Sequence, residues 1–189
     1  MANGMKHFGL GIVIGLAALV SIASIASAKT VAEKGSGSDT FSTTFFSYDG
    51  AGFAVLVTGA GKDNLGGAFT LQNVTEWTPT STSCTASDQS AGTTFDLVES
   101  DGVTTYKKGQ VFYTAKGSTA GSQCVSNTSR VSTGSITYTV TGGTGKLAAA
   151  TGSFTVTLSN VTLAAAGNPP GSGGLFGASQ FTLSGAVTF

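Results

Sequence analysis

The chain has 189 residues, with nine basic and nine acidic side chains and a formal net charge of zero at neutral pH. This balance supplies neither the basic stripe that nucleic acid binding requires nor an acidic tail. The chain is rich in Gly, Thr and Ser, and the part after residue 28 has no apolar pattern at helical spacing. These features favour an all-β protein with many turns.

The N-terminus predicts an export signal. Lys6 and His7 give a short positive start, and Leu10 to Ile25 is apolar apart from small residues. Ala26-Ser27-Ala28 then supplies the small-x-small pattern that signal peptidase recognises. Because the apolar run is short and lacks a stop-transfer flank, a retained membrane helix is the weaker interpretation. We therefore expect residues 1–28 to be cleaved and the protein to be secreted, either extracellular or periplasmic.

Removing the signal peptide would also remove the one histidine of the chain, His7. Without histidine, Ser-His and Cys-His catalysis are excluded, and so is the commonest neutral metal ligand. No metal site and no cofactor is expected from the rest of the sequence. Residues 29–40 are expected to be a flexible N-terminal segment, followed by a single β-barrel domain at residues 41–189.

Short apolar segments follow one another at the spacing expected of a barrel or a sandwich. About eight to nine strands and no helix are expected. The predicted strands comprise residues 41–48, 54–58, 66–77, 93–99, 103–106, 110–115, 136–141, 154–163 and 181–189.

Two polar segments, Thr78 to Gly92 and Lys116 to Ser132, are predicted to be loops, and each carries one cysteine. In an exported chain an even number of cysteines indicates a disulfide, so Cys84 and Cys124 are expected to join these loops. A redox or metal pair is the weaker alternative, because the spacing is far from C-x-x-C and further soft ligands are lacking.

The last third of the chain alternates most clearly between apolar and hydroxyl-bearing residues. Phe154, Val156 and Leu158 share one parity, whereas Val161 and Leu163 continue with the other. A slip of one residue turns the core face of a strand outward, so we expect a bulge or bend near Ser159-Asn160.

The glycine-rich stretch from Val140 to Ser153 reads VTGGTGKLAAATGS and could suggest a phosphate-binding loop. It fails the Walker A pattern, because Val140 stands where the first glycine should be and Leu147 follows Lys146. It fails the dinucleotide fingerprint as well, and strand-like residues return soon after it. A structural turn between two strands is therefore predicted, without nucleotide binding. Its turn residues are Gly142, Gly143, Thr144, Gly145 and Gly152.

The same stretch, extended to YTVTGGTGKLAAATGSFT, resembles the strand–turn–strand segment of the allene oxide cyclase and dirigent families and of small secreted bacterial proteins similar to them. Leu147 departs from the aromatic residue usual in that family. Upstream, NLGGAFT at residues 64–70 is similar to another short segment of the bacterial members. The resemblance implies an antiparallel eight-stranded β-barrel with an apolar interior, similar in outline to a lipocalin.

The barrel interior is the expected place of any binding site. The aromatic residues expected to line or fill it are Phe53, Phe69, Trp77, Tyr138, Phe154 and Phe181. Eight-stranded barrels are either filled by side chains or hold one small ligand, and the sequence leaves both open. Glu76, beside Trp77, is the one candidate catalytic acid, because burial near an aromatic ring would raise its pKa. The alternative is an ordinary carboxylate at the rim.

Three functions remain compatible with the sequence. The first is a secreted, non-catalytic barrel that binds an apolar small molecule or serves as a stable surface component. The second, implied by the resemblance, is a cyclase- or dirigent-type protein that acts on an apolar substrate in the barrel. The third is an outer-membrane barrel, which the shortage of aromatic girdle residues disfavours. Assembly into homo-oligomers is left open.

Overall fold

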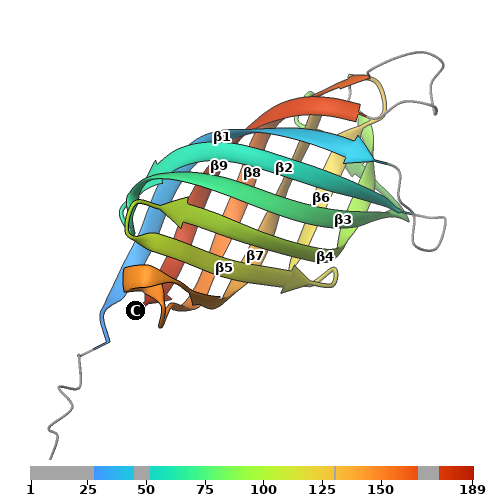
Figure 1. Ribbon diagram of the computed structural model, residues 1–189. Coiled ribbons are helices and arrows are strands. Elements are labelled where there is room, and N and C mark those ends of the chain that lie inside the picture. The colour runs from blue at the N-terminus through green and yellow to red at the C-terminus, as the bar shows by residue number, and fades with distance from the viewer. Residues whose placement is uncertain (1–27, 45–51, 130, 166–174) are drawn as a thin grey trace, which may run out of the picture.

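The computed structural model describes residues 28–44, 52–129, 131–165 and 175–189. These residues form antiparallel strands joined by short connections, with a single 3₁₀ turn, η1 (Gly145–Leu147) (Figure 1). The strands are β1 (Thr30–Thr44), β2 (Phe53–Asp63), β3 (Gly67–Thr85), β4 (Ala91–Tyr106), β5 (Gly109–Lys116), β6 (Gly121–Ser126), β7 (Val131–Gly143), β8 (Thr151–Ala165) and β9 (Leu175–Thr188). The described residues hold no helix long and apolar enough to cross a membrane.

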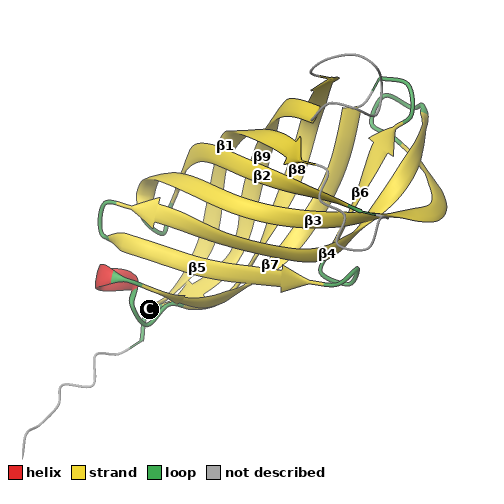
Figure 2. Ribbon diagram, turned by 45° about the vertical axis from the view of Figure 1, so that its right-hand side comes forward, coloured by secondary structure: helices red, strands yellow, loops and turns green. Residues whose placement is uncertain are grey.

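The strands close into a ring. Consecutive strands pair side by side, except β5 with β6, and β9 pairs with β1, which closes the sheet. β5 and β6 occupy one position in the ring, because both pair with β4 on one side and with β7 on the other. The pairings therefore arrange the nine strands in an eight-membered antiparallel ring. Figures 1 and 2 show its barrel shape. The expected all-β, eight-stranded architecture is confirmed.

The N-terminal segment differs from the expectation. Residues 29–40 were expected to be flexible, but most of them belong to β1, which pairs with β2 on one side and β9 on the other. The inward positions of β1 include Glu33, Gly35, Gly37 and Asp39 rather than a row of apolar residues. The usual apolar alternation of a strand is therefore missing from the sequence, although the backbone is fully paired.

Glycines on β1 and β2 make room for aromatic rings that cross the interior. A Cβ atom on Gly37 would lie 2.5 Å from the ring of Phe181, and one on Gly61 would lie 2.6 Å from the ring of Phe69. Real Cβ atoms do not approach neighbouring carbons so closely, so each ring requires a glycine opposite it. The aromatic rings and the glycines thus form complementary parts of one packed interior.

The predicted bend in β8 is confirmed. Between Ser159 and Thr162 the register of β8 with β9 shifts, and the register with β7 shifts at the facing residues Ser132 and Gly134. The shift absorbs the change of parity seen in the sequence.

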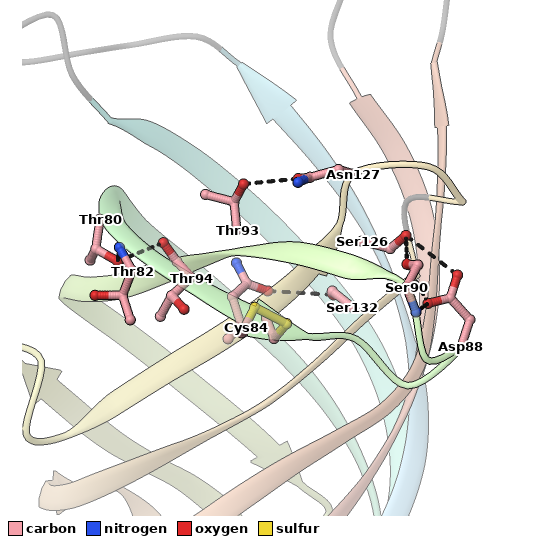
Figure 3. Close-up of a disulfide and its surroundings, with 12 residues drawn as sticks. Thr80, Thr82, Cys84, Asp88, Ser90, Thr93, Thr94, Ser126, Asn127 and Ser132 are labelled. Carbon is pink, nitrogen blue, oxygen red and sulfur yellow. Dashed lines mark hydrogen bonds between the residues drawn. A yellow bond between two sulfur atoms is a disulfide. The ribbon is translucent and has the colours of Figure 1, made fainter.

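The two cysteines form a disulfide, but the segments around them are strands rather than loops. Cys84 lies near the end of β3, and Cys124 lies in β6. The bridge passes over Gly92 of β4, where an added Cβ would lie 2.8 Å from one sulfur and 3.1 Å from the other. Figure 3 shows the disulfide on strands of the same barrel end as Asp88, Ser90 and Ser126. It ties β3 to β6 across the strand between them.

Candidate ligand-binding cavity

The ring of strands encloses a cavity of about 170 Å³, to which the inward-facing residues of the barrel contribute. Because side chains alternate along a strand, every second residue points inward. The lining is mostly aromatic and aliphatic. The structure places all six aromatic residues expected from the sequence in it, namely Phe53, Phe69, Trp77, Tyr138, Phe154 and Phe181.

Three rings pack together in the middle of the lining. The ring of Tyr113 meets those of Tyr138 and Phe154 edge to face, with centroids 4.9 Å and 5.0 Å apart, and the rings of Tyr138 and Phe154 stack at 5.4 Å. Such pairs fix ring orientation more strongly than aliphatic contacts do. The cavity therefore has rigid aromatic walls contributed by β5, β7 and β8.

A closed hydrogen-bond cluster interrupts the apolar lining. Asn73 Nδ2 donates to Tyr138 Oη at 2.7 Å, and Ser100 Oγ lies 2.9 Å from the same oxygen. Thr75 and Ser100 both donate to Asn73 Oδ1, at 2.9 Å and 2.8 Å. All four residues are buried. Burial raises the pKa of the Tyr138 phenol, so its hydroxyl remains a neutral member of the cluster.

Tyr138→Phe should lower the free energy of unfolding by about 2 kcal/mol, because it leaves the buried amide of Asn73 without its acceptor. Tyr113→Phe is the matched control. Its hydroxyl receives one long bond of 3.3 Å from Thr104, so less should be lost. Urea denaturation of both variants measures the difference. Equal losses would contradict the importance of the cluster.

Two buried carboxyls from β1 also line the cavity. Glu33 is 4% exposed, and its Oε2 is the buried side-chain atom of the described residues that has no hydrogen-bond partner. Burial, and secondarily the carboxylate of Asp63, raise the pKa of Glu33 to about 7. Burial also raises the pKa of Asp39, although hydrogen bonds from Ser179 oppose the shift. Glu33 can therefore hold or release a proton near neutral pH.

The glycine-rich connection between β7 and β8 lies at one end of the barrel and packs against the β4–β5 hairpin. Gly145 has a φ of +59°, a left-handed conformation that glycine adopts without strain. Thr144 and Lys146 donate backbone hydrogen bonds to carbonyls of Gln110 and Lys108, which holds the turn against the β4–β5 hairpin. Leu147 is completely buried beneath it. The stretch that superficially resembled a phosphate loop is thus a packed turn between two strands.

The candidate acid chosen from the sequence lies elsewhere. Glu76 stands between Thr75 and Trp77, which both point inward, so its own side chain lies on the outer side of β3, half-buried. The acids of the interior, Glu33 and Asp39, escaped the sequence analysis. The signal that could have found them is their parity: both share it with Val31 and Phe41, the apolar residues of β1.

The fold and the site together define an antiparallel eight-stranded β-barrel with a largely apolar interior cavity that contains buried carboxyls. Comparison of the chain with models of known families, with curated proteins and with solved structures finds no match.

Proposed function

We propose that the protein is an exported β-barrel that binds a small, mainly apolar molecule in its interior. The observation that carries the proposal is the cavity of about 170 Å³ inside a closed and well-packed ring. A protein cavity of about 150 Å³ with apolar walls accommodates benzene or xenon. This interior is therefore suited to a guest of about one aromatic ring with a short substituent.

The composition of the lining supports a binding role. Ligand sites are generally apolar concavities with a few convergent polar groups that orient the guest. Here aromatic walls surround Glu33, Asp39 and the cluster around Tyr138. A barrel stabilised purely by packing would gain nothing from a buried carboxyl that lacks a partner, because such a group costs stability.

The outer surface supports an aqueous location rather than an outer-membrane barrel. A membrane barrel presents apolar residues outward and polar residues inward, and this chain has the opposite arrangement over much of its surface. The exposed hydroxyls of Thr137 and Thr155 lie 2.9 Å apart across β7 and β8, and those of Thr30 and Thr188 lie 2.8 Å apart across β1 and β9. Large exposed apolar side chains occur on β2 to β5, at Leu56, Val74, Val98 and Phe112.

Binding can be followed through Trp77, the one tryptophan of the chain, which is 3% exposed and lines the cavity. Titration with toluene should change its fluorescence saturably and release heat in calorimetry. Val57→Phe, which adds bulk to the lining, should weaken toluene binding about tenfold or more. Leu56→Phe introduces the same ring on the outer face and should leave toluene binding intact.

Saturable binding that Val57→Phe and Leu56→Phe weaken equally would place the guest outside the cavity. If toluene caused neither a fluorescence change nor heat, the barrel would be filled by its own side chains and the proposal would be wrong. Circular dichroism of each variant verifies that the strands have formed before binding is compared.

A second candidate function is an enzyme or steering protein of the cyclase or dirigent type, acting on an enclosed apolar substrate. The observation that favours it is Glu33, a cavity carboxyl whose pKa of about 7 suits proton transfer near neutral pH. The test is turnover of an apolar epoxide by wild-type protein and by Glu33→Gln. Turnover that Glu33→Gln abolishes would replace the binding role with catalysis.

A further inference from the structure

The carboxyls among the described residues that line the cavity are not balanced by basic side chains. The cavity lining contains the carboxyls of Glu33 and Asp39 and, among the described residues, no lysine, arginine or histidine. Asp63 from β2 adds a third carboxyl close enough to act on Glu33. Lys108, at the same end of the barrel, donates to the carbonyl of Leu65 and lies 5.1 Å from the ring centroid of Phe189. The interior therefore lacks a cation that would balance its acids.

The acids in and beside the cavity differ in their hydrogen-bond partners. Asp39 accepts a hydrogen bond from Ser179, and both residues are buried. Asp63 accepts from Tyr106 at 2.5 Å and from the backbone of Gly66 at 2.8 Å. Glu33 Oε2, by contrast, is buried with no partner among the described residues. A buried carboxylate without partners is costly unless something pairs with it, so Glu33 is the group on which a ligand would act.

Aromatic rings stand close to the same region. Besides burial, the negative charge of Glu33 contributes to raising the pKa of the phenols of Tyr106 on β4 and Tyr113 on β5. The residue opposite Glu33 on β9 is Gly185, which has no side chain. The faces of aromatic rings attract cations as well as hydrocarbon. The surroundings of Glu33 thus combine an unpaired acid, a second acid and aromatic surfaces.

We propose that the cavity selects a small apolar amine, whose ammonium group pairs with Glu33 while its hydrocarbon part packs against Tyr113, Tyr138 and Phe154. An ammonium group supplies the donors and the charge that this carboxyl lacks, and the cavity volume accommodates a ring with a one-carbon arm. This inference depends on the proposed binding role and specifies the ligand class.

The experiment compares benzylamine with its neutral analogues toluene and benzyl alcohol, using Trp77 fluorescence and calorimetry at about pH 8, where Glu33 is ionised. We expect benzylamine to bind at least about tenfold more tightly than either neutral probe. In Glu33→Gln this preference should fall about tenfold. In Glu76→Gln, which removes a carboxylate from the outer side of β3, the preference should remain.

A measurement on the wild-type protein provides the same test if Glu33→Gln does not fold. The preference for benzylamine should shrink between about pH 8 and pH 5, because Glu33 becomes protonated while the amine keeps its charge. Neutral probes that bind as tightly as benzylamine at about pH 8 would overturn the amine proposal and leave the binding role standing. If none of the three probes bound, both proposals would fall.

Discussion

Removing the disulfide should lower the free energy of unfolding by about 4 kcal/mol. The bridge joins residues separated by 40 positions, and closing a loop of that length restricts the unfolded chain by roughly this amount on the chain-entropy account. For a domain of this size the melting temperature should fall by roughly 10 °C. Thermal denaturation of a double variant, Cys84→Ala with Cys124→Ala, measures the loss against oxidised wild-type protein.

Reducing agent provides the control for this prediction. It should lower the melting temperature of the wild-type protein to about that of the double variant, and it should leave the double variant unchanged. The bridge lies at the opposite end of the barrel from the connection between β7 and β8. The fold is therefore expected to survive both the reduction of the disulfide and the double substitution. Identical melting of the wild-type protein in oxidising and reducing buffers would contradict the stabilising role.

The stability of the protein should fall as the pH rises from about 4.5 to 7, and Glu33 should be the main cause. Its pKa is about 7 in the folded protein and near its ordinary value of 4.5 when the chain unfolds. Between these values the folded state holds a proton that the unfolded state has released, so raising the pH favours unfolding. The full difference corresponds to about 3 kcal/mol, reached above pH 7.

Glu33→Gln should remove most of this pH dependence. The variant should match the wild-type protein near pH 4 and exceed its stability at about pH 8 by up to about 3 kcal/mol. A residual slope of the same sign is expected from Asp39, whose pKa burial also raises. Chemical denaturation at several pH values measures both curves. A variant that is less stable than wild type at about pH 8 would contradict this account, because it would show that the ionised Glu33 has stabilising partners within the protein.

Asp88 provides a separate check on the pH dependence of stability, because its contribution decreases as the pH falls, whereas that of Glu33 decreases as the pH rises. Hydrogen bonds from Ser129 and Ser90 lower the pKa of its carboxyl from 3.8 to about 2. Its contribution to stability is present above its ordinary pKa and is lost as the pH falls toward about 2. The pH ranges over which Glu33 and Asp88 change the stability therefore do not overlap, and the stability of the protein should be greatest near pH 4.

The architecture was predictable because its dominant signal is local. Strands such as β7 and β8 alternate apolar and hydroxyl-bearing residues, and a half-buried strand requires that alternation. The same signal located the six aromatic residues of the lining and the bulge after Ser159. The proposed export signal and the segments at 45–51 and 166–174 lie outside the described residues, so the part of the predicted strand 41–48 beyond Thr44 remains a prediction.

The strand β1, the strand β6 and the buried acids were not predicted, because their placement depends on contacts between residues far apart along the chain. β1 has a glycine where a ring from β9 enters the interior, and β2 has one where a ring from β3 enters, and neither ring can be inferred from the strand that carries the glycine. The C-terminal end of β3 is largely exposed, and β6 is short and carries few large apolar residues, so both segments read as loop in the sequence. Glu76 was favoured because it adjoins Trp77, yet neighbours on a strand face opposite sides. Glu33 shares its parity with Val31 and Phe41, but the glycines between them conceal the strand pattern.

The central claim is that the closed barrel holds a cavity able to take up a small guest. A crystal structure of the protein under xenon pressure tests it most directly, because xenon occupies apolar cavities of this size without chemical specificity. We expect xenon density inside the ring, among Phe69, Trp77 and Tyr138. An interior without xenon density and filled by side chains at the same pressure would contradict the account.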